Sequence, residues 1–216
     1  APMKLYAAPL DFRAIADEFD VPTDFLPELH AEAANARDRY ADQRRDARDI
    51  EFVTIDPAGS MDLDQAVAIE GAGDGYRVYY AIADVAAFIE PGSGLHEESL
   101  KRGQTIYLPD EPARLHPEEL SEGSASLLPD ADKPAVLWTF ELDGAGELTS
   151  TNVERAMVRS VARLDYDGVQ EDMDNGTLHP SIALLPEVGE LRAVSSLRRH
   201  AINLRVPSVR VVELDD

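Results

Sequence analysis

The chain has 216 residues, no cysteine, and a formal net charge of −22 from 42 acidic and 20 basic residues. This composition excludes disulfide-linked partners, thiolate catalysis and cysteine-based zinc sites, and it argues against a broad, nonspecific nucleic-acid-binding face. Because the sequence has neither a run of 18 apolar residues nor a signal-peptide pattern, we expect a cytoplasmic protein without a membrane span.

The first part of the chain predicts two helices. Asp11 can cap the first helix, and Pro22 ends it. Its apolar stripe consists of Phe12, Ile15, Ala16 and Phe19. The second helix is predicted from residue 23 or 24 to about residue 45, and the pair resembles part of a helix-turn-helix. We therefore assign residues 1–47 to a small helical N-terminal domain.

Arginines alternate with aspartates toward the end of this predicted second helix. The arginines are Arg37, Arg39, Arg44, Arg45 and Arg48. A helix surface that carries both signs of charge at this spacing is typical of an exposed, salt-bridged face. We interpret the arginines and aspartates of this segment in that way.

From residue 51 the apolar pattern changes to the alternation that is typical of strands. Strands are predicted at residues 51–56, 65–70, 76–84, 135–142 and 209–213, with one or two more in residues 147–164. Helices are predicted at residues 95–102, 165–173 and 180–203. Residues 104–134 contain four prolines before Lys133 and read as a long ordered loop, a feature that is more often functional than filler. We interpret Trp138, the only tryptophan, as a core residue.

The stretch from Thr54 to Ala66 places the three carboxylates of Asp56, Asp62 and Asp64 within nine residues. Like charges this close raise one another's pKa unless a cation or hydrogen-bond donors compensate. A hard divalent cation such as Mg²⁺ removes the conflict, because it prefers oxygen ligands and leaves positions open for water and phosphate. The alternative is a solvated acidic loop, which is the simpler interpretation in so acidic a chain.

Other conspicuous residues offer less chemistry. The five histidines show no metal-ligand spacing, and Ser60, Ser121 and Ser126 have no histidine partner at the spacing of a serine hydrolase. The glycine-rich segment 71–75 lacks the lysine and following helix of a phosphate-binding loop. Asp84, at the end of an apolar strand, either supports a site or caps the next segment.

Five stretches together resemble the RNase II (RNB) family of exoribonucleases. They are residues 55–66, 80–85, 101–109, 115–127 and 159–170, in the order and spacing of that family. The resemblance covers roughly residues 48–172 and looks most like the short bacterial members of the family.

The resemblance implies an α+β fold in which residues 48–216 form the first part of an RNB-type catalytic domain, with a mixed, mainly antiparallel sheet and flanking helices. It implies a hydrolase that uses Mg²⁺, or Mn²⁺ in its place, to degrade single-stranded RNA from its 3′ end to nucleoside 5′-monophosphates. Asp56, Asp62 and Asp64 match three of the family's four acidic positions and are expected to be catalytic metal ligands. Tyr107 matches an aromatic position that contacts the terminal nucleotides, where ring stacking tolerates any base.

Two departures from the family pattern affect these expectations. Gln65 occupies the fourth acidic position, where its amide oxygen can still ligate a metal but brings no charge. The family's catalytic domain also extends well beyond 216 residues and is followed by an OB-fold RNA-binding domain. We therefore expect the amino-terminal part of a longer enzyme, poorly active or inactive by itself. The alternative is a non-catalytic RNA-binding or regulatory protein.

Overall fold

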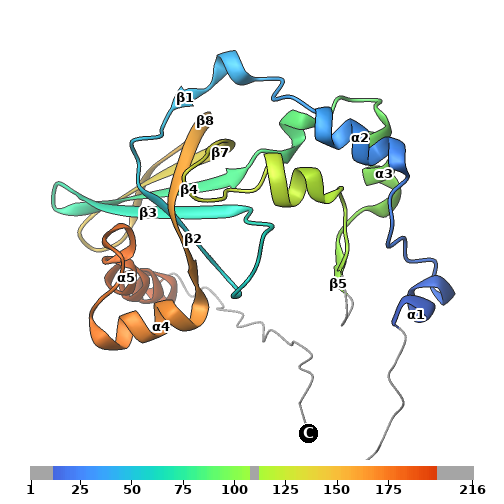
Figure 1. Cartoon of the computed structure of the whole chain (residues 1–216). Helices are drawn as coiled ribbons and strands as arrows, with labels where there is room; N and C mark the ends of the chain where they lie inside the picture. The colour runs from blue at the N-terminus through green and yellow to red at the C-terminus, as the bar shows by residue number, and fades with distance from the viewer. Residues whose placement is uncertain (1–11, 108–111, 199–216) are drawn as a thin grey trace, which may run out of the picture.

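The computed structural model describes residues 12–107 and 112–198 (Figure 1). Its centre is a six-stranded mixed sheet in the order β1-β8-β2-β3-β4-β7. The strands are β1 (Arg45–Asp46), β2 (Phe52–Asp56), β3 (Gln65–Ala72), β4 (Gly75–Ala83), β7 (Asp132–Leu142) and β8 (Leu148–Asp165). A separate two-stranded sheet pairs β5 (Ile106–Tyr107) with β6 (Pro112–Ala113).

The 18-residue strand β8 closes the large sheet on itself. One edge of β8 pairs with β7 in antiparallel orientation, and the other edge pairs with β1 and β2 in parallel orientation. Because antiparallel pairings also join β2 to β3, β3 to β4, and β4 to β7, the hydrogen-bonded pairings form a closed ring of five strands. The predicted α+β fold with a mixed, mainly antiparallel sheet is confirmed.

Every strand of this ring contributes at least one side chain to one buried cluster, and most of these side chains are small or aliphatic. Alternation along each strand explains the selection, since successive side chains point to opposite faces. In β2, for example, Phe52 packs into this inner cluster, whereas Val53 faces outward. Burying a side chain such as Phe52 contributes roughly 1.5–3 kcal/mol.

Helices from the C-terminal part cover the outer face of the ring, at the bottom of Figure 1. Val53 contacts residues of α4 (Tyr166–Asn175) and of the short turn η4 (Pro180–Ile182). Val188 of α5 (Leu185–Arg198) packs against β3 and β4 neighbours. The predicted helix over residues 180–203 is thus two elements, and its end, like the predicted strand at 209–213, lies outside the described residues.

A second group of helices packs beside one end of the ring. It comprises α2 (Pro27–Asn35), α3 (Gly94–Arg102) and the π-type turn η3 (Glu119–Ser124). Their shared cluster is Leu29, Ala33, Leu95 and Leu120. Since α2 precedes residue 47 and the other two follow it, contacts cross the predicted domain boundary, and the boundary itself stays a prediction.

The predicted helix from residue 23 to residue 45 is wrong in its extent. The first predicted helix is present as α1 (Phe12–Glu18), although its proposed cap, Asp11, lies outside the described residues. The second spans only α2, which has Pro27 in its first turn and an extended Ala36 at its end. The chain then continues through the short turn η1 (Ala41–Gln43) into β1.

A tertiary ion pair attaches the segment that follows α2 to the end of β4. The side chain of Arg44 is 1% exposed and pairs with both Asp38 (2.7 Å) and Asp84 (2.7 Å). Arg45 and Arg48 also pair with carboxylates, as predicted. Arg45 pairs with Glu154 on β8, and Arg48 pairs with Asp132 on β7 as well as with the nearby Asp46. The alternating charges therefore connect the chain to the sheet instead of to one helix face. Among the described residues, no helix is both long and apolar enough to cross a membrane.

Candidate functional site

The acidic residues lie on the loop that joins β2 to β3. Asp56 is the last residue of β2, and Gln65 is the first residue of β3. The loop begins with a tight turn in which the Ser60 N–H donates a hydrogen bond to the Pro57 carbonyl oxygen (3.1 Å). Gly59 adopts φ +83°, a conformation that favours glycine. The sequence Pro-Ala-Gly-Ser therefore reverses the chain and brings the later acids back toward Asp56.

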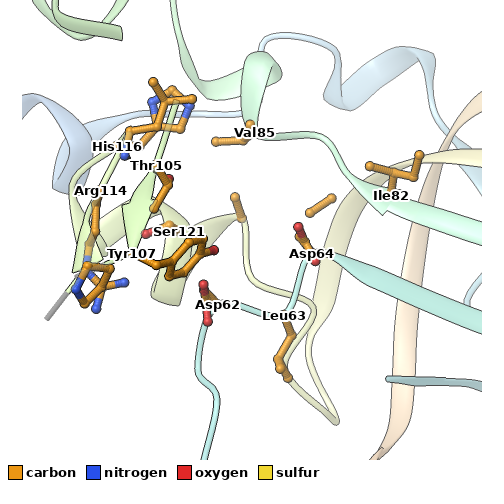
Figure 2. Close-up of a pocket in the computed structure, with 14 residues that line it drawn as sticks. Asp62, Leu63, Asp64, Ile82, Val85, Thr105, Tyr107, Arg114, His116 and Ser121 are labelled. Carbon is orange, nitrogen blue, oxygen red and sulfur yellow. Dashed lines mark hydrogen bonds between the residues drawn. The ribbon is translucent and has the colours of Figure 1, made fainter. Parts of the chain in front are cut away.

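Leu63 anchors the part of the loop that carries the other two acids. Its side chain is fully buried in the inner cluster. Its neighbours Asp62 and Asp64 line a cavity, to whose wall Leu63 also contributes (Figure 2). The carbonyl oxygen of Asp64 also accepts a hydrogen bond from the Ala83 N–H at the end of β4 (2.8 Å). One buried leucine thus holds a carboxylate on each side of it at the cavity wall.

The cavity has a volume of about 290 Å³ and brings together residues from distant parts of the chain. Its polar lining residues are Asp62, Asp64, Thr105, Tyr107, Arg114, His116 and Ser121. Figure 2 shows the Tyr107 ring, which comes from β5, next to Asp62. Three of the predicted site residues, Asp62, Asp64 and Tyr107, therefore share one cavity.

Asp56 is not among the residues that line this cavity, but it lies close enough to Asp64 and Asp62 for their charges to act on its carboxylate. One of its carboxylate oxygens, Oδ2, is buried and has no hydrogen-bond partner within residues 12–107 and 112–198. Burial raises the pKa of Asp56, and the charges of Asp64 and then Asp62 raise it further. In the sheet register Asp56 pairs with Asp165, which the sequence marked only as a helix start and whose side chain caps α4 by accepting from the Gly168 N–H (2.7 Å).

The loop concentrates negative charge at the cavity. Burial raises the pKa of Asp64, its own backbone N–H lowers it, and the charge of Asp62 raises it again. Burial followed by the charges of Asp62 and Asp64 also raises the pKa of the Tyr107 hydroxyl. For Tyr80, burial and the charge of Asp64 have the same effect on the pKa. A cation in this region would stabilise the ionised form of every one of these groups.

The oxygen donors of the acidic residues suit a hard cation that needs only a few ligands from the protein. Within the described parts of the chain, no group of three or more His, Asp or Glu side chains converges as a ready metal site. Mg²⁺ is usually held by one or two carboxylates, with water and phosphate oxygens completing its octahedron. Such an ion would bond the Oδ2 of Asp56, which has no partner in the described residues, and would offset the mutual repulsion of the three acids. Gln65 is exposed next to Asp64, at the first position of β3.

Two basic residues of the cavity were not predicted as site residues. Arg114 lines it and pairs with Glu122 (2.7 Å). His116 also lines it. Burial lowers the pKa of its ring, and its buried Nδ1 has no hydrogen-bond partner among the described residues. Both residues fall in or next to the motif stretch 115–127. Their spacing in the sequence did not reveal them, because they reach the acids only through the fold, in which β5 pairs with β6. The sequence left two roles open for Asp84, supporting a site or capping the next segment. Among the described residues its side chain makes no cap hydrogen bond, and it pairs with Arg44.

Comparison with known proteins identifies the family of the chain. The RNB domain family matches residues 44–215. Ribonuclease R from Chlamydia muridarum is 32% identical over 209 residues, which cover 93% of this chain and 30% of that protein. Ribonuclease R from Acidithiobacillus ferrooxidans is 36% identical over 148 residues, which cover 68% of this chain and 34% of the relative.

Solved structures show the same fold. The structure of Mycoplasma genitalium RNase R in complex with double-stranded RNA superposes with a TM-score of 0.81 at 25% identity, over 87% of this chain and 35% of that one. Yeast Ssd1, described as a pseudonuclease, shares the fold with a TM-score of 0.64 at 18% identity, over 83% of this chain and 21% of that one. The chain spans about a third or less of each of these proteins. With the family match covering most of its length, this chain belongs to the RNB family of ribonucleases.

Proposed function

We propose that this chain carries the acidic half of the active site of a hydrolytic 3′-to-5′ exoribonuclease. Its substrate would be single-stranded RNA and its products nucleoside 5′-monophosphates. The observation that carries the proposal is the shared cavity, in which Asp62 and Asp64 lie beside the exposed ring of Tyr107 in a chain of the RNB family. A carboxylate cluster next to an aromatic ring suits a nucleotide, because the cluster can hold a phosphate-bridging cation while the ring takes the base.

Mg²⁺, or Mn²⁺ in its place, would be held by Asp56, Asp62 and Asp64, either directly or through its water ligands, with Gln65 as an uncharged fourth ligand. When bound, the ion supplies Lewis-acid activation of water and neutralises charge on the scissile phosphate. The chain's own contribution is placement. The strand ends fix Asp56 and Asp64, and the buried Leu63 directs Asp62 and Asp64 to the same wall.

Tyr107 is proposed to contact the terminal nucleotides. Its side chain is 75% exposed although it lines the cavity, so one face of the ring is available for a base. Stacking on a ring does not depend on base identity, which is what a general exonuclease requires. One solved complex of Mycoplasma genitalium RNase R contains double-stranded RNA and another contains ribose-methylated single-stranded RNA. The second complex supports single-stranded RNA as the partner proposed here.

A labelled-RNA assay tests the proposal. Single-stranded RNA with a 5′ label is incubated with Mg²⁺ and the full gene product, in parallel with the 216-residue chain. We expect a ladder that shortens from the 3′ end, release of nucleoside 5′-monophosphates, and loss of both on chelation of the metal. The 216-residue chain alone is expected to hydrolyse RNA slowly, since it covers only about a third of the length of its relatives.

Asp64→Asn is the matched variant for this assay. Removing one carboxylate from the cluster should abolish most of the cleavage, by a factor on the order of 100 or more, because a metal ligand is lost. Asp74→Asn is the control, since Asp74 lies exposed in the turn at the other end of the β3–β4 hairpin. Unchanged cleavage by Asp64→Asn would refute the role of Asp64.

Gln65 favours one alternative, a non-catalytic RNA-binding or regulatory protein. It replaces an acidic ligand with a neutral one, and the fold is shared with a described pseudonuclease. The same assay separates the two functions. Binding of the labelled RNA by the full gene product without Mg²⁺-dependent shortening would favour the alternative.

A further inference from the structure

One buried hydroxyl holds both ends of the Asp62 residue. The Ser126 Oγ donates a hydrogen bond to the Met61 carbonyl oxygen (2.6 Å) and accepts one from the Leu63 N–H (3.0 Å). These two groups belong to the peptide units on either side of Asp62. The Ser126 residue is 1% exposed, so water does not compete for either bond. The backbone on both sides of Asp62 is therefore fixed by the same oxygen atom.

Other hydrogen bonds also hold this part of the loop, but none of those in the described residues takes the place of the Ser126 hydroxyl. The Leu127 N–H donates to the Leu63 carbonyl oxygen (2.7 Å). That bond is made by main-chain atoms and would survive a change of side chain. The other side chain bonded to the Met61 region is Arg163, whose Nη1 approaches the Ser60 carbonyl oxygen (3.3 Å) at an exposed position. Among the described residues, Ser126 thus provides the buried side-chain attachment of the loop.

This geometry excludes a nucleophilic role for the serine. Its hydroxyl proton is committed to the Met61 carbonyl, and its buried oxygen accepts from Leu63. No base contacts Oγ in the described residues, and Ser126 is not among the residues that line the cavity. What the hydroxyl can do is limit the movement of the backbone that carries the carboxylate.

We propose that Ser126 is a positioning residue that sets the carboxylate of Asp62 for the divalent cation, an inference that rests on the proposed function. The loop carries three mutually repelling acids, so it needs an attachment that keeps Asp62 near Asp64 and Asp56 before the cation arrives. At this point the backbone needs a donor for the Met61 carbonyl oxygen and an acceptor for the Leu63 N–H. A hydroxyl supplies both. Pre-positioned ligands bind metal more tightly because less ordering accompanies binding.

The test compares Ser126→Ala with the wild-type protein, in the full gene product. Mn²⁺ is titrated without RNA, and the free ion is followed by electron paramagnetic resonance. Ser126→Ala is expected to weaken Mn²⁺ binding by about 10-fold to 100-fold, the range found when partners of metal ligands are removed. It should lower kcat for RNA at fixed Mg²⁺ while changing KM less than about twofold, because Tyr107 and the RNA contacts are untouched.

Two further serine variants separate positioning from packing. Ser126→Cys keeps the buried volume but supplies only weak hydrogen bonds, so it is expected to behave like Ser126→Ala, whereas Ser126→Thr retains the hydroxyl and should recover most of the Mn²⁺ affinity. The control is Ser160→Ala. Ser160 is a serine of β8 with similar burial, 2% exposed, whose Oγ donates to the Ala162 carbonyl oxygen (3.1 Å) away from the loop. It should lose stability without losing Mn²⁺ affinity.

Hydrogen exchange of residues 57–64 in metal-free protein gives a readout that needs no activity. We expect faster exchange in Ser126→Ala and Ser126→Cys, and wild-type exchange in Ser160→Ala. Equal Mn²⁺ affinity and equal exchange in Ser126→Ala and wild type would overturn the positioning role alone. A wild-type protein that neither binds Mn²⁺ nor hydrolyses RNA would overturn the proposed function, and the positioning role with it.

Discussion

Replacing Arg44 with methionine should strongly destabilise the fold, because this guanidinium is the centre of a buried charge network. Its Nε and Nη2 donate to the two oxygens of Asp38 (2.7 and 3.0 Å), and Nη2 also donates to Asp84 (2.7 Å). Nη1 donates to the Ala135 carbonyl oxygen (3.1 Å) in β7. The carboxylate side chains are 12% and 10% exposed, so neither can regain full hydration when the cation is removed.

The expected loss follows from those two carboxylates. Removing one partner of a buried ion pair typically costs about 3–5 kcal/mol, because the remaining charge stays buried without compensation. For a protein of this size, each kcal/mol lowers the melting temperature by about 2–4 °C, so a fall of roughly 6–20 °C is expected for Arg44→Met. Methionine keeps most of the aliphatic volume, which makes the lost charge the main change.

Arg48→Met is the matched control, since Arg48 also pairs with two aspartates, Asp46 and Asp132, but at the surface. Its side chain is 43% exposed, and exposed pairs contribute little. Urea unfolding followed by circular dichroism should therefore give a large shift for Arg44→Met and no resolvable shift for Arg48→Met. Equal midpoints for the two variants would refute the assignment of Arg44 as a buried structural cation.

Three further predictions concern the acidic loop and the cavity. An acid whose pKa is raised by folding stabilises the folded state only while protonated, so the contributions of Asp56 and Asp64 are present below the ordinary value of 3.8 and are lost as pH rises through their higher folded values. In metal-free protein, the melting temperature of Asp64→Asn should therefore rise relative to wild type between about pH 4 and about pH 7; parallel curves would contradict the predicted repulsion. Gln65→Asp adds a charged ligand and should tighten Mn²⁺ binding by on the order of tenfold in the same titration, whereas unchanged affinity would show that position 65 does not ligate the ion. Tyr107→Leu should weaken binding of fluorescently labelled single-stranded RNA by about 1–3 kcal/mol, measured by anisotropy, while Tyr107→Phe should bind as the wild type does; equal weakening in both would indicate a role for the hydroxyl instead of stacking.

The strands were predictable because their pattern is local. Alternation of apolar and polar side chains places β2, β3 and β4 within a residue or two of their observed bounds. The closure of the sheet by β8 was not predictable, because it depends on which strands pair across more than 100 residues. The second predicted helix was wrong for the same kind of reason. The partner that draws Arg44 out of a helix is Asp84, which is 40 residues away.

The same division applies to the candidate site. Asp56, Asp62 and Asp64 could be predicted because they are close in sequence, and the structure brings two of them to one cavity with Tyr107. Arg114 and His116 could not be, because only the fold brings the β5–β6 region opposite the loop. Ser126 was considered only as a nucleophile, whereas its two hydrogen bonds to a loop 63 residues away give it a structural task.

The acidic loop combines two properties that oppose each other. Burial and mutual repulsion raise the pKa values of Asp56 and Asp64, and no donor in the described part of the chain bonds Oδ2 of Asp56. The metal-free loop is therefore destabilised. The ring of strands and the Ser126 hydroxyl nevertheless hold the acids together, and that combination favours a cation. Gln65 reduces the number of charges at this point by one. A neutral residue there should leave the metal-free protein more stable and its cation more weakly bound. Gln65→Asp should therefore lower the melting temperature of the metal-free protein, and Mg²⁺ should raise the melting temperature of this variant more than that of the wild type.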